Sequence, residues 1–317
     1  MKISSFLKLV EIQTKAASII PFILGNLYAL LRFESFSLKN FLLMLISLLS
    51  IDMATTAINN YIDYKKAIKT EGFGYESHNA IVKDGLKEST VQATIGTLLA
   101  IAVVFGILLF LNTNLVVLIL GAISFGIGIC YTFGPVPISR TPFGEIFSGF
   151  TMGFVIFFLA IYIHVFAGDL VTLGLLQGIF SISVNLKELI YIFIISISVV
   201  SGIANIMLAN NICDIEDDIH NKRYTLPIFI GKERALKLFA FLYYAAYVAI
   251  VIAVLLGALP WLSLLTIFTL NPVKNNIKAF KAKQTKKDTF ILAVKNFILI
   301  NAAHIILLSV GAIINRL

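Results

Sequence analysis

The stretch that decides the fold is LIYIFIISISVVSGIANIMLANNICDIEDDIHNKRYTLPIFIG, residues 189–231. Residues 189–209 form an apolar run of the length, roughly 20 residues, that a helix needs to cross a bilayer. Directly after it, Asp214 and Asp218 stand four residues apart, so on a helix both carboxylates project from one face. Carboxylates at the mouth of a membrane helix are costly unless a cation neutralises them. The stretch therefore predicts a membrane helix that ends in a cation-binding cluster.

The chemistry of this cluster favours magnesium. Asn210 lies one turn before Asp214 on the same stripe, so the cluster offers only oxygen ligands. Proteins usually hold Mg²⁺ through one or two carboxylates, while phosphate oxygens and water complete its shell. Lys222 and Arg223 follow in the chain and are residue types that bind diphosphate. The simpler alternative is a solvated loop of acidic and basic residues, which is common between membrane spans.

A second stretch, NNYIDYKKAIKTEG at residues 59–72, repeats the pattern Asn-Asn-x-x-Asp at the end of another apolar run, 41–58. The two copies lie about half the chain apart. This spacing predicts a single membrane domain, 1–317, built from two related halves, about 1–165 and 166–317. Related halves that meet at one substrate site are a common design in membrane proteins. We therefore expect the two Asn-Asn-x-x-Asp stretches to approach each other.

A polar stripe runs along the helix that leads into the first copy. Its members share one helical face because they recur at steps of three or four residues: Asp52, Thr55, Asn59 and Asp63. A polar stripe within a membrane span faces a cavity or a protein partner rather than lipid.

Composition sets the fold class. Hydrophobic residues make up 59% of the 317 positions, more than the roughly half that is usual in soluble domains. The runs that are apolar enough to cross a membrane, of which the eighth is short, are 16–31, 41–62, 90–111, 115–131, 144–166, 189–209, 235–256, 261–270 and 290–314. The prediction is an all-α polytopic membrane protein with about nine transmembrane helices around a central cavity that opens laterally to the bilayer.

The distribution of basic residues predicts the orientation. The net charge is +8, and with the N-terminus inside, most Lys and Arg residues fall on the cytoplasmic side of the plasma membrane, as the positive-inside rule requires. This bias explains the charge without nucleic acid as a partner. It also places both Asn-Asn-x-x-Asp stretches at the cytoplasmic face. The basic segment 271–288 is interpreted as attracting anionic membrane lipid, whereas the external segment 168–187 is uninformative.

The connection YTFGPVPISRTPFGE, residues 131–145, contains three prolines and two glycines, which predict a fixed, non-helical segment. Glu145 opens the next span, where an acid either favours the helix dipole or contacts substrate. Arg140 either serves the positive-inside bias or binds substrate. Cys130 and Cys213 lack the spacing of metal ligands, and a disulfide is not expected on the reduced side of the membrane.

Together these three stretches resemble the UbiA-type membrane prenyltransferases, and most closely the branch that acts on 1,4-dihydroxy-2-naphthoate in menaquinone synthesis. The resemblance covers nearly the whole chain. Its most specific part is the family's second Asp-rich motif, matched by Asn211, Asp214, Asp218, Arg223, Thr225, Leu226 and Gly231. The connection resembles the naphthoate branch through Gly134, Pro135, Pro137, Gly144 and Glu145.

The family's first motif is only partly kept. Asn59, Asp63 and Tyr64 match it, but the family generally has another Asp where this chain has Lys69, and a Gly where it has Ala67. One expected metal carboxylate is therefore replaced by a cation. Two interpretations remain open: Lys69 contacts diphosphate directly, or Glu71 takes the ligand role.

The resemblance implies an Mg²⁺-dependent enzyme that moves a polyprenyl group from a polyprenyl diphosphate to an aromatic acid. With 1,4-dihydroxy-2-naphthoate as the acceptor, demethylmenaquinone, diphosphate and CO₂ form. The catalytic residues expected on this basis are Asp63, Asp214 and Asp218. The expected metal ligands are Asn59, Asp63, Asn210, Asn211, Asp214 and Asp218. Diphosphate is expected to bind Lys65, Lys66, Lys69, Arg140 and Arg223, and the aromatic acceptor to bind Asp52, Tyr131 and Glu145.

Three alternatives stay open. The first is a prenyltransferase for another aromatic acceptor. The second is a transporter, since internal repeats and intramembrane acids also suit that class; polar residues that gather at two cytoplasmic mouths favour an enzyme instead. The third is a membrane protein that binds quinones or isoprenoids without catalysis. The sequence does not indicate protein partners.

Overall fold

The computed structural model describes residues 1–66, 79–134 and 136–314, and most of these residues are helical. Within these ranges, eight helices are long and apolar enough to cross a membrane: Ile12–Arg32, Leu38–Lys65, Glu88–Leu111, Leu115–Thr132, Gly144–Val165, Leu186–Cys213, Lys232–Leu255 and Ile291–Ile314. The prediction of an all-α polytopic membrane protein is confirmed. Eight of the predicted spans overlap these helices.

The ninth predicted span, 261–270, takes another form. A 3₁₀ helix, η4 (Trp261–Thr269), runs directly into α14 (Leu270–Ala282). A 3₁₀ helix rises about 2 Å per residue, so the apolar part covers roughly 18 Å of a hydrocarbon core that is roughly 30 Å thick. This segment is therefore not among the eight helices that are long and apolar enough to cross a membrane, and a ninth span stays a prediction.

The described chain divides into two compact units. The first comprises Met1–Ser18 and Leu42–Pro137, and the second comprises Ile19–Phe41 and Ile138–Leu317. The division differs from the predicted repeat halves, 1–165 and 166–317. A repeat is a relation between sequences rather than a packing unit, so the two halves stay a prediction.

The first unit is helical throughout its described part. Its elements are α1 (Ile3–Leu9), η1 (Ile12–Lys15), the start of α2 (Ala16–Arg32), most of α3 (Leu38–Lys66), α5 (Ala80–Lys83), α6 (Glu88–Leu111) and α7 (Leu115–Thr132). Helix α7 begins where the Asn114 side chain accepts a hydrogen bond from the Val116 amide, a standard N-cap. One apolar cluster of this unit joins Leu9, Ala57 and Val91.

A buried ion pair explains the polar stripe of α3. Lys15 is 1% exposed, and its Nζ donates to Asp52 Oδ1 at 2.6 Å and to Thr56 Oγ1 at 2.7 Å. Ser18 Oγ donates to the other carboxylate oxygen of Asp52 at 2.5 Å. The expectation that this stripe faces a partner is met at Asp52. Both of its oxygens are engaged inside the first unit, which gives Asp52 a structural role there.

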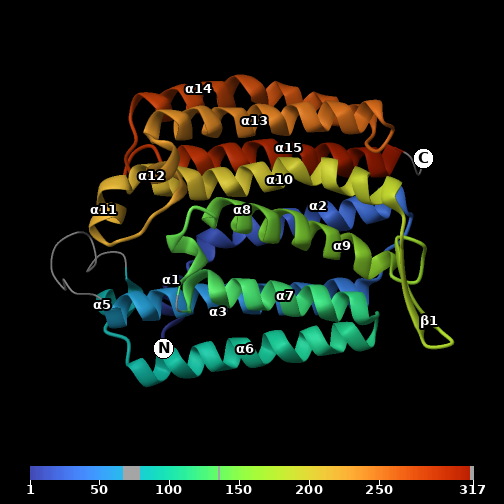
Figure 1. Cartoon of the computed structure of the whole chain (residues 1–317), viewed down its shortest axis with the longest axis horizontal. Coiled ribbons are helices and arrows are strands. Elements are labelled where there is room, and N and C mark those ends of the chain that lie inside the picture. The colour runs from blue at the N-terminus through green and yellow to red at the C-terminus, as the bar shows by residue number, and fades with distance from the viewer. Residues whose placement is uncertain (67–78, 135, 315–317) are drawn as a thin grey trace. The chain divides into compact units, whose positions relative to one another are not determined.

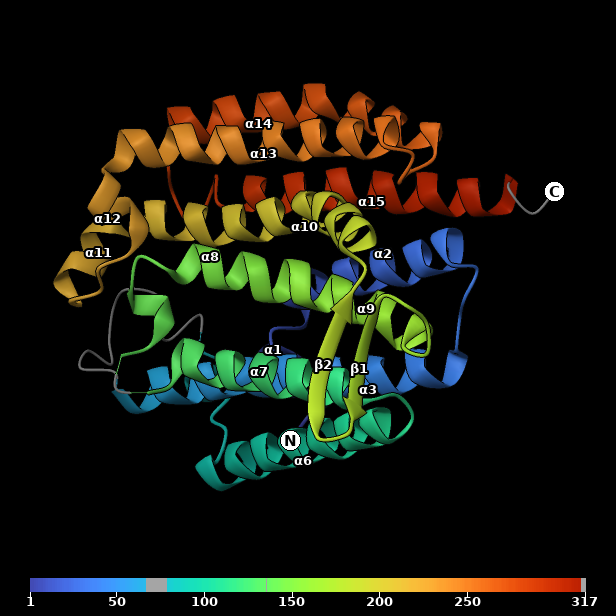
Figure 2. The same cartoon turned by 45° about the vertical axis from the view of Figure 1, so that its right-hand side comes forward.

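The second unit is larger. Its elements are most of α2, η2 (Ile138–Arg140), α8 (Gly144–Ser148), the π-helical segment η3 (Gly149–Val155), α9 (Ile156–Val165), β1 (Val171–Leu176), β2 (Ile179–Val184), α10 (Leu186–Cys213), α11 (Ile215–His220), α12 (Leu226–Ile230), α13 (Lys232–Leu255), η4, α14 and α15 (Ile291–Ile314). Helices α10, α13, α14 and α15 lie side by side (Figure 1). The β1–β2 hairpin lies at one end of α10, and α11 and α12 lie at its other end (Figures 1 and 2).

Small residues and buried amides hold this unit together. A Cβ on Gly153 would lie 2.6 Å from Val200 Cα, so only glycine allows η3 to approach α10 this closely. The Asn205 side chain of α10 donates to the Phe239 carbonyl of α13 at 3.0 Å, and Tyr243 Oη donates to the Ala293 carbonyl of α15 at 3.2 Å. Close backbone contact and interhelical hydrogen bonds are the usual means of helix association in membranes.

Candidate active site

The acidic stretch lies at the C-terminal end of α10, in the second unit. Helix α10 ends at Cys213, and Asp214 adopts φ −103° and ψ 9° before α11 begins at Ile215. The helical stretch that carries Asp214 and Asp218 is therefore interrupted at Asp214. The Asp218 amide still donates to the Asp214 carbonyl at 2.7 Å, so the helical spacing of the two residues survives the break.

A lysine ammonium is held between two side chains of the motif. Lys286 Nζ lies 2.7 Å from Asp214 Oδ2 and 2.7 Å from Asn210 Oδ1. Lys286 comes from the segment between α14 and α15, 76 residues from Asn210 in the chain. Two oxygens of the predicted metal site thus converge on one cation. The sequence does not indicate Lys286 as a site residue, because no spacing links it to the motif, and its segment is expected only to attract anionic lipid.

Asp218 is the most enclosed carboxylate of the motif, with 3% of its side chain exposed. Arg223 Nε lies 3.3 Å from Asp218 Oδ1, and Thr225 Oγ1 donates to Oδ2 at 3.1 Å. Burial raises the pKa of Asp218 above its ordinary value, while the charge of Arg223 and the hydrogen bond from Thr225 oppose this rise. A cation bound here would further favour the ionised carboxylate, since an opposite charge lowers the pKa of an acid.

The proline-rich connection docks against the same motif. The Tyr224 amide donates to the Arg140 carbonyl at 3.0 Å, and Arg223 Nη2 donates to the Ser139 carbonyl at 3.4 Å. These bonds bring η2 beside the segment that follows α11. The Arg140 side chain is exposed. Two predicted diphosphate-binding residues, Arg140 and Arg223, therefore lie on adjoining segments of one unit.

Glu145 and Asn211 form a buried pair. They are 3% and 0% exposed, and Asn211 Nδ2 donates to Glu145 Oε1 at 2.8 Å. Among the described residues, neither Glu145 Oε2 nor Asn211 Oδ1 has a hydrogen-bond partner. Buried polar atoms are normally satisfied, so these two acceptors are available for a hydrogen bond from a ligand. The structure thus brings Glu145 to the acidic motif, as its predicted substrate role requires.

The first Asn-Asn-x-x-Asp copy lies near the end of α3, in the first unit. Asn59 and Asp63 are exposed, whereas Asn60 is buried. Asn60 Nδ2 donates to the Leu9 carbonyl at 2.9 Å and to Glu11 Oε1 at 3.3 Å. Because each copy belongs to a different compact unit, their approach to each other stays a prediction.

The remaining predicted site residues belong to the first copy and its surroundings. Lys65 Nζ pairs with Glu88 Oε2 at 2.6 Å, and Tyr131 lies in the last turn of α7. Lys69 and Glu71 fall outside the described residues, and so does the side chain of Lys66. Their proposed contacts with diphosphate or metal stay predictions.

Among the residues that the structure describes, no group of three or more His, Cys, Asp and Glu side chains is arranged to hold a metal. Magnesium rarely uses such an all-protein cage, because it keeps several waters and takes phosphate oxygens from the substrate. The fit to Mg²⁺ rests instead on the donor set, since carboxylate and amide oxygens already converge on the Lys286 ammonium.

The comparison with protein families identifies the chain. The model of the UbiA prenyltransferase family matches residues 18–299. The chain belongs to the UbiA prenyltransferase family. This result confirms the resemblance that the sequence motifs predicted.

Relatives of this UbiA family member support the assignment. It is 32% identical over 305 residues to a Bacillus subtilis (strain 168) protein named 1,4-dihydroxy-2-naphthoate octaprenyltransferase, covering 96% of this chain and 90% of the relative. Two solved archaeal structures share its fold. The apo UbiA homolog of Aeropyrum pernix K1 has a TM-score of 0.67 at 19% identity, covering 91% of this chain and 97% of that one. The Archaeoglobus fulgidus UbiA homolog bound to GPP and Mg²⁺ has a TM-score of 0.65 at 14% identity, covering 96% and 99%.

Proposed function

We propose that this membrane protein transfers a polyprenyl group from a polyprenyl diphosphate to 1,4-dihydroxy-2-naphthoate, with Mg²⁺ as cofactor. Three findings support the proposal. The Bacillus subtilis relative carries the corresponding name. The Archaeoglobus fulgidus homolog was solved with a prenyl diphosphate and Mg²⁺. The observation that carries most weight is the convergence of Asn210 and Asp214 on one cation, beside the buried Asp218 and its partner Arg223.

In this proposal the metal ligands of the second unit are Asn210, Asp214 and Asp218. Bound Mg²⁺ supplies Lewis-acid stabilisation of the charge that develops on the leaving diphosphate. Lys286 neutralises Asp214 before substrate binds, because it lies 2.7 Å from that carboxylate. With half of its side chain exposed, Lys286 has room to turn toward a diphosphate oxygen when the donor is present.

The arginines of the second unit complete the proposed diphosphate site. Arg223 is anchored by Asp218 and by the Ser139 carbonyl, so its guanidinium is held in place before the substrate arrives. Arg140 is exposed on the adjoining segment and adds a second guanidinium. Planar guanidinium groups bind phosphate oxygens through paired hydrogen bonds. Asn59, Asp63, Lys65, Lys66 and Lys69 are proposed to serve the same reaction on the basis of the repeated motif and the resemblance alone.

Glu145 is proposed to orient the acceptor. Its Oε2 atom is buried without a partner among the described residues and can accept a hydrogen bond from a ring hydroxyl. The C–O bond of the prenyl diphosphate breaks, and its electron pair leaves with diphosphate. The ring carbon that bears the carboxylate forms the new C–C bond, and loss of CO₂ returns an electron pair to the ring. No oxidant takes part, so the first product is the hydroquinone form of demethylmenaquinone.

The proposed site opens to the cytoplasm from the plasma membrane. The support for this orientation is the positive-inside rule. The segments between spans that lie on the same side as the N-terminus carry most of the Lys and Arg residues. Cysteine substituted at the exposed Lys222, in a chain without Cys130 and Cys213, would test this orientation. The proposal predicts no labelling by an impermeant reagent in intact cells and ready labelling in inverted vesicles, whereas labelling in intact cells would contradict it.

The activity itself is tested with the purified full chain in lipid nanodiscs. The assay contains Mg²⁺, radiolabelled polyprenyl diphosphate and a panel of aromatic acids. We expect a prenylated product with 1,4-dihydroxy-2-naphthoate and the release of one CO₂ per product. If product forms only with another aromatic acid, that acid is the acceptor and 1,4-dihydroxy-2-naphthoate is not. No product with any acid, together with transport of the isoprenoid across proteoliposomes, would support a transporter instead.

A further inference from the structure

The β1–β2 hairpin is the one part of the described chain with paired strands, and its two faces differ in chemistry. The strands pair antiparallel, with Val171 opposite Val184, Leu173 opposite Ile182, and Gly174 opposite Ser181. Successive residues of a strand point to opposite faces. The segment, which sequence analysis left uninterpreted, therefore has two distinct surfaces.

One face of the hairpin is apolar, and the other is small and polar except beside the turn. On the apolar face, Phe180 is 57% exposed and Ile182 is 61% exposed. Val171, Leu173 and Val184 continue this face by their register. The opposite face carries Thr172, Gly174, Ser181 and Ser183, and beside the turn it also carries Ile179, which is 70% exposed. An isolated two-stranded hairpin is marginally stable in water, so an exposed apolar face of this kind calls for a covering surface.

The base of the hairpin carries residue types that are typical of a membrane interface. Tyr191, in the second turn of α10, has Arg32 Cζ 5.5 Å and Lys187 Nζ 5.7 Å from its ring centre. Tyrosine together with Arg and Lys marks the headgroup region of a bilayer, because these side chains are apolar along their length and polar at the tip. Asn185, which caps α10, directly follows β2.

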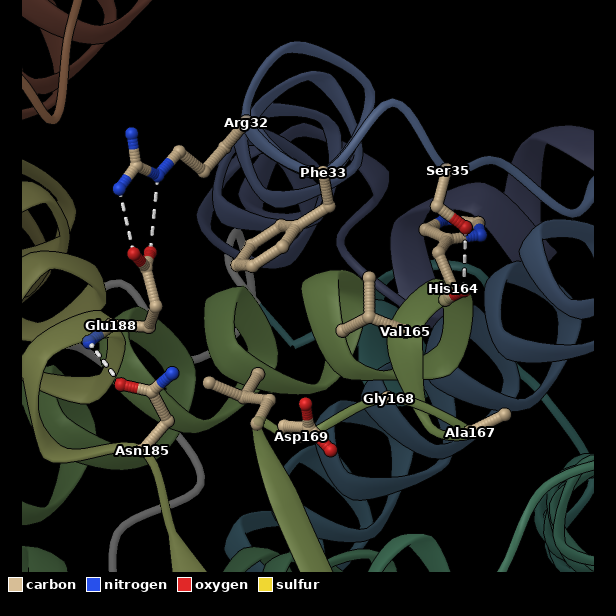
Figure 3. A pocket seen from close by; sticks show the side chains of 11 residues that line it. Arg32, Phe33, Ser35, His164, Val165, Ala167, Gly168, Asp169, Asn185 and Glu188 are labelled. Atoms are coloured by element: carbon tan, nitrogen blue, oxygen red, sulfur yellow. Dashed lines mark hydrogen bonds and ion pairs between the residues drawn. The ribbon is translucent and has the colours of Figure 1, made fainter.

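A cavity with charged and apolar residues in its lining lies beside the base of the hairpin. It has a volume of about 670 Å³ and is lined by Arg32, Asp169, Asn185 and Glu188, among others. Figure 3 shows Arg32 and Glu188 facing each other through two hydrogen bonds, of 3.1 and 2.6 Å. Charged groups that line an open cavity are expected at the headgroup level rather than in hydrocarbon. The hairpin therefore leaves α9 and returns to α10 at the water–lipid boundary.

The apolar face continues a lipid-facing stripe of α10. Leu186, Ile190 and Phe193 are 66%, 54% and 47% exposed and recur at steps of four and three residues, which is one helical face. In a membrane span such a stripe faces acyl chains. Leu186 follows Val184 by only two positions, so the stripe and the hairpin's apolar face adjoin at the membrane boundary.

We propose that the β1–β2 hairpin lies on the bilayer surface, with Phe180 and Ile182 among the acyl chains and Ser181 and Ser183 toward water. The 28 residues of α10 rise roughly 42 Å at about 1.5 Å per residue, so the hairpin contacts the leaflet opposite to Asp214. The hairpin is thus an interfacial anchor at the end of the second unit that carries no acidic motif. This inference is independent of the proposed reaction.

Tryptophan quenching by brominated lipid tests the inference on the full chain. The sequence has a single tryptophan, Trp261, so Trp261→Phe gives a background without tryptophan fluorescence. Phe180→Trp reports on the apolar face, and Ile182→Trp is a second probe of that face. Ser181→Trp is the matched control, because its cross-strand neighbour is Gly174 and leaves room for the ring. Each variant is reconstituted in vesicles of phospholipid with bromines at the shallow part of the acyl chain.

The proposal predicts blue-shifted emission and strong quenching for the Phe180→Trp and Ile182→Trp variants, and red-shifted emission with weaker quenching for Ser181→Trp. Equal quenching on both faces would overturn the orientation. Red-shifted, unquenched emission in all three variants would show that the hairpin stands in water. Blue-shifted but unquenched emission from Phe180→Trp would show that protein covers the face, and a dependence on protein-to-lipid ratio would identify that protein as a second copy. Unquenched emission from Phe180→Trp, whether red-shifted or blue-shifted, would overturn the proposal.

Discussion

The two Asn-Asn-x-x-Asp copies share an internal arrangement within their own units. In each copy the second asparagine is buried: Asn60 is 8% exposed and Asn211 is 0% exposed. In each, its amide reaches a glutamate carboxylate, Glu11 or Glu145. The first asparagine and the aspartate of each copy are more exposed. The repeated pattern therefore contains a structural position and two positions that can meet a ligand.

The copies differ in the cation that accompanies them. In the second copy, Lys286 sits between Asn210 and Asp214. In the first copy, the neighbouring Lys65 pairs with Glu88, which is not part of the motif. In the second copy, the contacts of the described residues therefore gather two proposed ligand oxygens around one positive charge. The comparison of the two copies also argues that Asn211, predicted as a metal ligand, acts by positioning Glu145.

The largest effect is expected from removing a carboxylate of the second copy. Asp214→Asn or Asp218→Asn should lower turnover by about a thousandfold, because several kcal/mol of metal-mediated charge stabilisation are lost and about 1.4 kcal/mol is a factor of ten. Turnover in the reconstituted prenyl-transfer assay measures this. Asp217→Asn is the matched control, since Asp217 is exposed and adjoins Asp218. Near-normal turnover of both variants would show that Asp214 and Asp218 do not bind the catalytic metal.

The two asparagines of the second copy should separate structure from binding. Asn211→Ala leaves Glu145 buried without its donor, so it should lower the free energy of unfolding by about 1–3 kcal/mol. Asn210→Ala should leave thermal stability nearly unchanged and raise the Mg²⁺ concentration needed for half-maximal turnover. Melting curves and Mg²⁺ titrations of both variants measure the two effects. The opposite pattern would contradict these roles: Asn211→Ala would then raise the Mg²⁺ concentration needed for half-maximal turnover, and Asn210→Ala would lower thermal stability.

Lys286 should compete with Mg²⁺ for the same oxygens. Without the donor, Lys286→Met should strengthen Mg²⁺ binding about fivefold, which corresponds to about 1 kcal/mol for a partly exposed ion pair. Binding of Mn²⁺, followed by its paramagnetic resonance signal, measures this without turnover. Lys283→Met is the control, since it removes the same charge from a lysine paired with Asp288. Equal effects of the two variants would show a general change in charge rather than direct competition.

The smallest effect is expected in the first unit. Asn60→Ala removes the bonds to the Leu9 carbonyl and to Glu11, and it should cost about 1 kcal/mol of stability. Its Mg²⁺ requirement should stay the same, because Asn60, like Asn211, is expected to have a structural role rather than to bind the metal. A changed Mg²⁺ requirement at unchanged stability would show that the second asparagine of the first copy is a ligand.

The sequence predicted the parts of this molecule that depend on local pattern. Apolar runs located eight spans, and the spacing of Asp214 and Asp218 located the acidic end of α10. The sequence missed contacts between distant segments, such as Lys286 with Asp214, because no local spacing records them. It also missed the hairpin, because the alternation of Phe180, Ile182 and Val184 with Ser181 and Ser183 is short and does not show which segment it pairs with. The break at Asp214 escaped detection because Asp and Asn occur both within helices and at their ends.

The most direct test of the central claim is the binding of a non-hydrolysable prenyl thiodiphosphate to the full chain, measured calorimetrically with and without Mg²⁺. We expect tight binding to the wild-type protein only when Mg²⁺ is present. Asp214→Asn should lose this dependence on Mg²⁺, and Asp217→Asn should keep it. Equal affinity with and without Mg²⁺ in the wild-type protein, or an unchanged Mg²⁺ dependence in Asp214→Asn, would contradict the claim that the second copy binds the metal that holds diphosphate.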